Sequence, residues 1–439
     1  MKIQKLVAGL IVLIVCVLAP TLGFAQITSN AKGMITEYSS GNQDSIYVFC
    51  GKKGEINASL TATSPTGEVA TFDWLKYNTL TGTFDFFSSD ISGSTSSTIS
   101  PLQDGAYRVN ITPTGGVVAT YTAWVFNNYS EAAITNSDCN SFTLVGTSPV
   151  LTYVDFPTGT SKTVKGILVN WTAGSETVST FLTAQVFSPP YLDTDYTLTV
   201  SYGLGCISTS VVKYISIVTK ADFTYVLEEQ KGVPTGKKEA PLTVTFTNKS
   251  LNYTPGTSQW FIYKDRAEII LESQANPGAV IDSFLTKLFD DGPIIYVFQK
   301  PGAYNVKLVS QKKSEFTTCY DTVYIDNFIE IQESFLEAPN FFTPGGSIGQ
   351  NDEFVVRFFS MKTVKISIFN RWGKIVHIYE NNNVQGFGAT RASYPESIWD
   401  GKVGGKLAVP GVYYYVVNGI GRDDKRRKAN GFVHLFRGK

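Results

Sequence analysis

The stretch Pro301-Gly302-Ala303-Tyr304-Asn305-Val306-Lys307-Leu308 contains a turn followed by a strand. From Tyr304 onward its apolar residues alternate with polar ones, and period-two alternation is typical of a half-buried β strand. The Pro-Gly pair in front of the tyrosine favours a tight turn. The same alternation is found in three other runs, Tyr107–Ile111, Tyr196–Val200 and Leu242–Phe246. These runs predict antiparallel sheets with one buried face.

The tyrosine-led strand recurs about every hundred residues. Four tyrosines begin such strands, at spacings of 89, 108 and 109 residues: Tyr107, Tyr196, Tyr304 and Tyr413. Each is preceded by a tryptophan in an apolar run: Trp74, Trp171, Trp260 and Trp372. A tryptophan on a central strand, followed by a turn and a tyrosine-led strand, is typical of immunoglobulin-like sandwiches. Four copies at a similar period predict four sandwiches in tandem.

We therefore expect an all-β protein, with four tandem immunoglobulin-like β-sandwich domains after a cleaved signal peptide. The expected boundaries are 1–25 for the signal peptide, 26–128, 129–219 and 220–333 for three domains, and 334–439 for the last. Ser334–Ala338 reads as a short linker, and short linkers favour end-to-end stacking into a rod. The best helical candidate is a turn or two within Ala279–Leu288.

The N-terminus has the features of a secretory signal. Lys2 and Lys5 precede the apolar run Leu6–Leu18, and Gly23-Phe24-Ala25 offers small residues for cleavage after Ala25. The apolar run is shorter than the ~20 residues of a membrane-spanning helix. A lipoprotein attached through Cys16 is the other alternative, but bulky Val15 precedes that cysteine. We expect an exported chain that does not span the membrane.

Four cysteines remain after cleavage, and export permits disulfides. Four cysteines allow three pairings. Cys139 and Cys206 fall in one expected domain, so we predict that they pair and that Cys50 and Cys319 stay unpaired. Closing that loop would stabilise the domain by about 4 kcal/mol.

Composition argues against several functions. Lys plus Arg (37) equals Asp plus Glu (37), so the chain lacks the basic excess typical of nucleic-acid binding. The two histidines, His377 and His434, lie in alternating strand-like runs, where a structural role is commoner than catalysis. No histidine–cysteine cluster has zinc spacing, and no glycine-rich phosphate loop is evident. We expect neither enzymatic activity, nor a metal, nor a cofactor.

Residues 221–326 resemble the PKD-type immunoglobulin-like domain of surface proteins. The resemblance is carried by Ala221-Asp222-Phe223, by Ala240-Pro241-Leu242 with the strand after it, by Asn248-Lys249-Ser250 and by Pro301-Gly302-Ala303-Tyr304. The usual Trp-x-Phe-Gly-Asp-Gly segment is altered here to Trp260-Phe261-Ile262-Tyr263-Lys264-Asp265. PKD domains are mostly spacers and adhesive modules, and the resemblance implies such a role.

The last hundred residues resemble the gliding-motility-associated C-terminal domain, the type B sorting domain of the type IX secretion system in Bacteroidetes-like bacteria. The resemblance implies these motif residues: Pro339, Asn340, Phe342, Thr343, Pro344, Asn351, Asp352, Phe369, Asn370, Arg371, Trp372, Gly373, Trp399, Asp400, Gly401, Pro410, Gly411 and Tyr413. The family's Asn-Gly-Asp-Gly turn is replaced by residues 345–350, which lack the carboxylate that might hold a cation. The motif residues either hold the sandwich together or contact the translocon directly.

This resemblance predicts a non-enzymatic cell-surface or extracellular protein. Its C-terminal domain would be the sorting signal, and the immunoglobulin-like rod would serve adhesion or assembly. The expected partners are the type IX translocon and associated outer-membrane β-barrel proteins, with surface glycans or other cell-surface proteins as further candidates. One alternative is a structural component of the secretion or gliding-motility machinery. Another is a carbohydrate-binding surface protein.

The charged run Arg422–Lys428 is either a solvated hairpin tip or an electrostatic contact for a partner.

Overall fold

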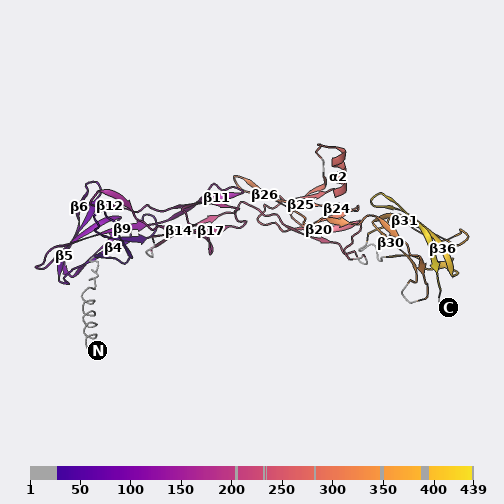
Figure 1. Ribbon diagram of the computed structural model, residues 1–439, viewed down its shortest axis with the longest axis horizontal. Helices are drawn as coiled ribbons and strands as arrows, with labels where there is room; N and C mark the ends of the chain where they lie inside the picture. Colours follow the sequence, from indigo (N-terminus) through magenta and orange to yellow (C-terminus); the bar gives the residue numbers. More distant parts are fainter. Residues whose placement is uncertain are drawn as a thin grey trace, which may run out of the picture. The chain divides into compact units, whose positions relative to one another are not determined.

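The computed structural model describes residues 27–202, 206–230, 233, 235–280, 283–346, 351–386 and 395–437. The expected signal peptide, with Cys16, lies outside the described residues. Nearly every described element is a β strand, so the all-β prediction is confirmed (Figure 1). The chain divides into two compact units between Ile215 and Ser216, with Pro190–Leu192 belonging to the second.

In the first unit, residues 27–128 form two sheets, in the orders β1-β4-β7 and β2-β3-β9-β8-β5-β6. Strands β3 and β9 pair in parallel, and the other neighbours are antiparallel. The strands are β1 (Ile27–Thr28), β2 (Gly33–Ile35), β3 (Ser45–Cys50), β4 (Ala58–Thr63), β5 (Ala70–Asn78), β6 (Thr83–Ser94), β7 (Ser96–Leu102), β8 (Gly105–Pro113) and β9 (Ala119–Asn128). Alternate residues of both sheets form a core around Phe72, Trp74 and Val109, all fully buried.

The rest of the first unit contains three more antiparallel sheets, in the orders β10-β11-β16, β12-β13 and β15-β14-β17-β18. The strands are β10 (Glu131–Thr135), β11 (Ser141–Thr147), β12 (Thr152–Asp155), β13 (Thr160–Thr163), β14 (Leu168–Ala173), β15 (Glu176–Ser179), β16 (Thr183–Phe187), β17 (Thr194–Ser201) and β18 (Ile207–Tyr214). One core surrounds Phe142 and Trp171. A second core joins Tyr153 of the β12-β13 hairpin to Trp124 of the six-stranded sheet.

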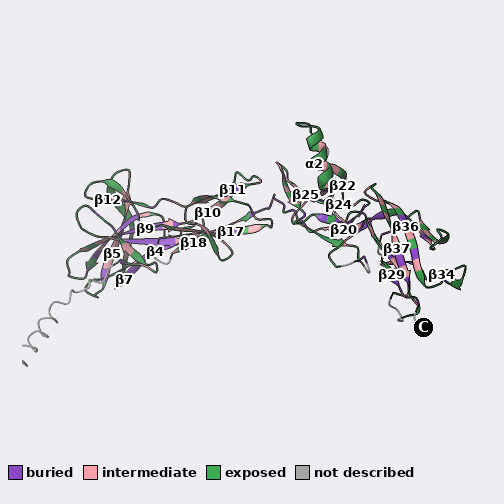
Figure 2. Cartoon of the chain, turned by 45° about the vertical axis from the view of Figure 1, so that its right-hand side comes forward, coloured by how far each residue is buried: buried purple, intermediate pink, exposed green. Residues whose placement is uncertain are grey.

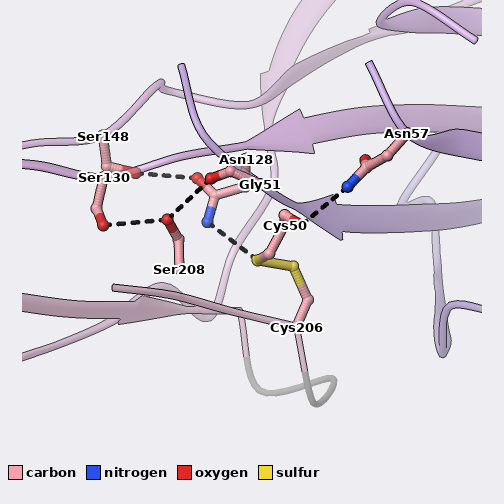
Figure 3. Close-up of a disulfide and its surroundings, with 8 residues drawn as sticks. All are labelled: Cys50, Gly51, Asn57, Asn128, Ser130, Ser148, Cys206 and Ser208. Atoms are coloured by element: carbon pink, nitrogen blue, oxygen red, sulfur yellow. Dashed lines mark hydrogen bonds between the residues drawn. A yellow bond between two sulfur atoms is a disulfide. The ribbon is translucent and has the colours of Figure 1, made fainter. Parts of the chain in front are cut away.

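A disulfide joins these two parts of the first unit. Cys50, at the end of β3, is bonded to Cys206, which directly precedes β18 (Figure 3). The side-chain amide of Asn128 lies 3.7 Å from Cys50 Sγ, and Ser208 Oγ donates to the Gly51 carbonyl oxygen at 3.4 Å. The predicted Cys139–Cys206 pairing is therefore wrong. It assumed that partners share a domain, whereas packing of the β12-β13 hairpin onto the six-stranded sheet brings β3 and β18 together. Cys319 was also expected to be unpaired, but it is disulfide-bonded, as is Cys139.

In the second unit, residues 223–331 form antiparallel sheets in the orders β19-β20-β23, β22-β21-β25-β26 and β24-β27. The strands are β19 (Phe223–Leu227), β20 (Leu242–Asn248), β21 (Gln259–Tyr263), β22 (Phe284–Phe289), β23 (Ile294–Phe298), β24 (Gly302–Tyr304), β25 (Val306–Lys313), β26 (Thr318–Tyr324) and β27 (Ile329–Ile331). Fully buried residues around Trp260 and Phe246 form their core.

The described helix of this part is α2 (Arg266–Ala275), and the helix predicted within Ala279–Leu288 is wrong. The Asp265 carboxylate caps α2 by accepting hydrogen bonds from the backbone N–H groups of Ala267 and Glu268. Helix α2 buries none of its residues, and most of it is exposed in Figure 2. Phe284 onward instead forms β22, because its alternating residues pair with β21.

Residues 335–435 form sheets in the orders β28-β30-β33, β29-β37-β36-β31-β32 and β34-β35. The strands are β28 (Phe335–Glu337), β29 (Phe341–Phe342), β30 (Phe354–Phe359), β31 (Met361–Phe369), β32 (Ile375–Asn381), β33 (Glu396–Trp399), β34 (Lys402–Val403), β35 (Lys406–Leu407), β36 (Gly411–Gly421) and β37 (Arg426–Leu435). The core surrounds Phe342, Phe354 and Trp399. The expected linker Ser334–Ala338 is mostly strand β28, which pairs with β30.

The tyrosine turn has the same geometry in three of its four copies. The hydroxyl groups of Tyr107, Tyr304 and Tyr413 each donate to the carbonyl oxygen four residues earlier, at 3.0, 2.9 and 2.8 Å. The glycines two residues before them, Gly105, Gly302 and Gly411, have φ of 141°, 148° and 146°. These backbone angles favour glycine.

Three of the four tryptophans expected in the cores are buried there, and the fourth is not. Trp74, Trp171 and Trp260 are fully buried, whereas Trp372 is 75% exposed. Trp372 lies in a hairpin turn, and Trp399 takes the buried position in its part of the chain. The error arose because the hairpin turn is flanked by apolar strands on both sides, so its tryptophan reads as part of an apolar run.

Candidate functional site

The motif residues of the C-terminal part lie at one end of the five-stranded sheet. Strand β29 pairs in parallel with β37, so that Phe341 lies beside His434 and Phe342 beside Leu435. The backbone N–H of His434 donates to the Asn340 carbonyl oxygen at 2.8 Å, which extends this pairing. The chain after Pro339 is therefore tied directly to the last strand.

The Thr-Pro turn after β29 is held by the following acidic segment. The backbone N–H of Thr343 donates to the Asn351 carbonyl oxygen at 2.6 Å, and that of Gly345 donates to Asp352 Oδ1 at 2.9 Å. Residues 347–350 of the altered turn lie outside the described residues. Asp352 thus stabilises the turn.

The Trp399-Asp400-Gly401 motif forms a second turn against the first. A Cβ at Gly401 would lie 2.9 Å from Pro344 Cγ, so a larger residue would force the two turns apart. Arg437 completes the contact by donating to the carbonyl oxygens of Gly401 and Ala408, at 2.8 and 3.2 Å. Arg437 ends the closing block Gly431–Arg437 of the sorting-domain resemblance but is not among the predicted motif residues. Its contacts with the two carbonyl oxygens depend on tertiary packing, which a sequence block does not show.

The side chains of this second turn have structural partners. The indole N–H of Trp399 donates to the Lys402 carbonyl oxygen at 2.7 Å, and its ring makes an edge contact with Tyr413 at 5.0 Å. The Lys402 ammonium lies 2.8 Å from Asp400 Oδ2, and its hydrogen bond holds the pKa of Asp400 below the usual value. Gly411, after Pro410, has φ of 146° and lets the chain enter β36. These residues hold the sandwich together.

The Asn370–Gly373 motif forms the hairpin turn between β31 and β32. Asn370 Oδ1 accepts hydrogen bonds from the backbone N–H groups of Trp372 and Lys374, both at 3.0 Å. Gly373 has φ of 78°, which favours glycine. The Arg371 guanidinium lies 4.2 Å from the Trp372 ring centroid, and both side chains are exposed. Unlike Trp399, this arginine–tryptophan pair is free to contact a partner.

The five-stranded sheet has one side against the core and one side outward. We call the outward side the outer face; its residues include Phe341, Lys365, Ser367, Phe369, Ile375, Ile378, Glu380, Val412, Tyr414, Val416, Asn418, Ile420, Arg426, Lys428, Asn430, Phe432 and His434. The strand register arranges them in rows. One row crosses four strands as Phe432, Tyr414, Phe369 and Ile375. The end of the outer face near the Asn370–Gly373 hairpin is therefore apolar, and Phe432 is 51% exposed.

The opposite end of the outer face is basic. The row Lys428, Asn418, Lys365 crosses three strands and ends at Glu380, which forms a 2.8 Å ion pair with Lys365. Arg426 lies on the same side, and neither it nor Lys428 has an ion pair among the described residues. A hollow of about 440 Å³ is lined by Lys365, Arg426 and Lys428 together with Glu380, Asn382 and Gly419. The outer face therefore combines an exposed apolar area with unpaired positive charge.

A buried polar cluster fixes this part of the chain to the segment that precedes β20. Glu239 is 1% exposed and accepts a hydrogen bond from the Ser360 backbone N–H at 3.1 Å. The backbone N–H of Arg422 donates to the Ser360 carbonyl oxygen at 2.7 Å. Burial lowers the pKa of Arg422, and the charge of Glu239 opposes that shift. Arg422 is therefore structural, as is Arg427, which donates to Ser334 Oγ and Asp423 Oδ2. Lys425, Arg426 and Lys428 are the exposed basic residues of the run.

The two histidines take part in ring contacts. His377 lies 6.5 Å from the Trp399 ring, and His434 stacks on Phe436 at 5.5 Å. Across the residues that the structure describes, no group of three or more His, Cys, Asp or Glu is placed to hold a metal ion. No helix within the described ranges is long and apolar enough to cross a membrane.

Comparison with known proteins identifies the C-terminal segment. Residues 336–435 match the CHU_C Type IX secretion signal domain. Among curated proteins, no sequence matches this chain.

Several solved structures resemble the chain at low identity. The three N-terminal domains of the bacteriophage RB49 Highly Immunogenic Outer Capsid protein are 12% identical, cover 67% of this chain and 96% of their own, and have a TM-score of 0.25. A Ca²⁺-stabilized adhesin of an Antarctic bacterium that binds ice is 11% identical, over 94% of this chain and 100% of its own, with a TM-score of 0.20. The protocadherin GammaB4 extracellular domain is 12% identical, over 93% and 68%, with a TM-score of 0.20. At these scores the similarities carry no functional information.

The family match covers the motif turns, the buried Trp399 and all of the outer face. The signal indicates export to the cell surface or the extracellular space. The expected resemblance is confirmed: residues 336–435 form a type IX secretion signal domain.

Proposed function

We propose that this protein is a non-enzymatic cell-surface or secreted protein, and that segment 334–439 directs its passage across the outer membrane. In this proposal, 26–128, 129–219 and 220–333 are immunoglobulin-like domains that serve adhesion or assembly. The single observation that carries the proposal is the match of residues 336–435 to a type IX secretion signal domain. The exposed apolar strand residues of the first unit, such as Phe86 at 72% and Ile91 at 78%, suit surface contacts.

The outer face of the C-terminal sheet is the surface that we propose the translocon reads. The other side of this sheet is closed by the core around Phe342 and Trp399. Recognition of the folded sheet must then use side chains that reach solvent. The apolar end of the outer face supplies contact area. The unpaired charges of Arg426 and Lys428 steer the outer face toward an acidic surface on the partner.

Deletion of residues 334–439 tests the assignment in the native cell. We expect the truncated protein to reach the periplasm and to stay there, whereas the full chain is digested by protease added to intact cells. A reporter that carries the signal peptide and segment 334–439 should reach the surface. Normal surface display of the truncated protein would overturn the assignment.

Charge reversal on the outer face tests the recognition surface separately. Arg426→Glu with Lys428→Glu, and separately Phe432→Ser, should each reduce surface display of the full chain by about tenfold, because they remove steering charge or contact area. Lys406→Glu is the matched control, since Lys406 is exposed on the separate β34-β35 hairpin. Unchanged thermal unfolding of the purified variants shows that the fold is intact. Equal display of all four proteins would exclude the outer face as the recognition surface.

Affinity purification from the native cell distinguishes cargo from machinery. A cargo protein should be recovered without stoichiometric outer-membrane partners after export is complete. Stoichiometric recovery of translocon or β-barrel subunits would favour a structural component of the machinery.

A further inference from the structure

Two lysines flank a single phenylalanine on the outward side of the sheet β22-β21-β25-β26. Phe261 on β21 lies directly opposite Lys287 on β22 and Lys307 on β25. Directly opposed residues of antiparallel strands point to the same side of the sheet. The ammonium nitrogen of Lys287 lies 4.9 Å from the Phe261 ring centroid, and that of Lys307 lies 4.1 Å from it. The separation of the two nitrogens therefore cannot exceed the sum of these distances.

Further aromatic rings surround the two ammonium groups. We call this cluster the lysine–aromatic face; it comprises Phe261, Tyr263, Phe284, Lys287, Lys307 and Tyr324. The ring centroids of Phe261 and Tyr263 lie 5.0 and 4.9 Å from that of Phe284. Lys307 Nζ is within 6.0 Å of all four rings. The rings hold the lysines close to the sheet surface through cation–π attraction.

The positive charge of this face is not neutralised by a carboxylate. Some other lysines of the second unit have acidic partners, such as Lys264 with Glu272 at 2.9 Å. Within the part of the chain that the structure describes, neither Lys287 nor Lys307 has an ion pair. Cation–π contact at an exposed site contributes only about 0.5–1 kcal/mol and leaves the charge in place. The face therefore holds two adjacent positive charges that an anion between them would stabilise.

Exposed aromatic rings continue the face on both sides of the charged centre. Phe289 on β22 is 64% exposed, and its ring lies 4.8 Å from Lys287 Nζ. Across the sheet, Tyr320 and Tyr324 on the edge strand β26 are 63% and 49% exposed. The arrangement is a strip in which aromatic rings alternate with cations, with exposed rings at its ends and the buried Phe261 ring between the two lysines. An extended ligand with alternating apolar and anionic parts would match it.

We propose that the lysine–aromatic face binds an acidic polysaccharide, one built from sugars that carry carboxylates. A sugar carboxylate between Lys287 and Lys307 forms charge-assisted hydrogen bonds with both ammonium groups. The apolar C–H faces of neighbouring sugar rings pack on the rings of Phe289 and Tyr324. A neutral polysaccharide would leave the two charges uncompensated. This inference rests on the adhesive role proposed above, for which it supplies the ligand class.

Binding of the purified full-length mature protein to alginate, a polymer of uronic acids, tests the proposal. We expect binding by calorimetry or affinity electrophoresis, and about tenfold weaker binding when salt rises from roughly 50 to 500 mM, because salt screens the charges. Dextran, which is neutral, should not bind. Equal retention of the protein by dextran and alginate would overturn the proposal.

Variants locate the site. Lys287→Gln with Lys307→Gln should weaken alginate binding by about tenfold, because both charge-assisted contacts are lost. Phe289→Ala should weaken it by about threefold, through lost ring contact. Lys249→Gln is the matched control, since Lys249 is exposed and follows β20 of the other sheet. Unchanged binding in the double lysine variant would overturn the assignment of the site.

Two further measurements keep the outcomes separate. If polyglutamate binds as tightly as alginate, the face is a docking surface for an acidic protein and the polysaccharide assignment is overturned. Surface display of the double lysine variant should equal that of the original protein, because the signal lies in 336–435. The double lysine variant should therefore lose alginate binding and keep normal display, which tests the polysaccharide proposal. The outer-face variants should lose display and keep alginate binding, which tests the proposed recognition surface.

Discussion

The backbone N–H of Ser360 donates a hydrogen bond of 3.1 Å to the carboxylate of Glu239, 121 residues earlier in the chain. Ser360 lies between β30 and β31, and Glu239 lies just before β20. Ser360 Oγ also donates to the Gln332 carbonyl oxygen at 2.7 Å and accepts from the Ala240 backbone N–H at 3.0 Å. One fully buried serine therefore joins three segments of the second unit.

Ser360→Ala should destabilise the second unit by about 2 kcal/mol, because it leaves the buried N–H of Ala240 and the half-buried carbonyl of Gln332 without their partner. Thermal unfolding of the purified chain measures this as a lower midpoint. Ser367→Ala, on the outer face of β31, is the control and should leave the midpoint unchanged. Equal midpoints for both variants would show that the serine bridge does not contribute.

Gly302→Ala should destabilise the second unit by about 2 kcal/mol. Gly302 has φ of 148°, and a Cβ there would clash with Asp265 Oδ1, which accepts a hydrogen bond from the Ala303 backbone N–H at 2.6 Å, while Oδ2 of the same carboxylate caps α2. Two causes contribute, backbone strain at positive φ and the clash of the new Cβ with Asp265. Gly278→Ala separates them, because Gly278 also has positive φ but no atom within 4 Å of its Cβ position. Denaturant unfolding should show the larger loss for Gly302→Ala. A loss no larger than that of Gly278→Ala would mean that contact with Asp265 is unimportant.

Replacing Cys50 and Cys206 together with alanine should destabilise the first unit by about 4 kcal/mol, because the bond closes a long loop. Thermal unfolding with and without a reductant measures the effect. The reductant should lower the midpoint of the original protein more than that of the double variant. The same response to reductant in both proteins would contradict a stabilising role for this bond.

Asp423 should make the second unit sensitive to acid. Burial raises the pKa of Asp423, but hydrogen bonds from Ser334 and from the Lys425 backbone, and the charge of Arg427, outweigh it and leave the pKa below its usual value. A carboxyl with a depressed folded-state pKa stabilises the fold above its unfolded pKa of about 3.9. This contribution is lost as the pH falls from there through the folded pKa.

Asp423→Asn should therefore lower the unfolding midpoint at pH 7 and lose less stability than the original protein on going to pH 3. Asp424→Asn is the control, because Asp424 is 67% exposed and pairs with Lys300 on the surface. Melting curves at the two pH values make the comparison. An unchanged pH dependence in Asp423→Asn would exclude Asp423 as the acid-sensitive group.

The sequence alone determined the features that depend on neighbouring residues. Alternation predicts the strands, and runs such as Tyr196–Val200 lie within them. The Pro-Gly turn before Tyr304 and the Asn370–Gly373 hairpin are local devices, because a few backbone angles define them. The sorting-domain resemblance could also be recognised from the sequence. Its motifs are mostly turns, and a turn requires particular residues at neighbouring positions.

Only the tertiary structure decided the features that bring distant residues together. It pairs Cys50 with Cys206, because a hairpin from one predicted domain packs on a sheet of another. It exposes Trp372 and buries Trp399, a choice that depends on which side of the sheet meets the core. The outer face and the lysine–aromatic face depend on register, that is, on which residues of neighbouring strands lie opposite one another. The pattern of residues along a single strand does not specify this register. Local sequence sets backbone conformation, whereas burial and side-chain proximity follow from packing between segments far apart in the chain.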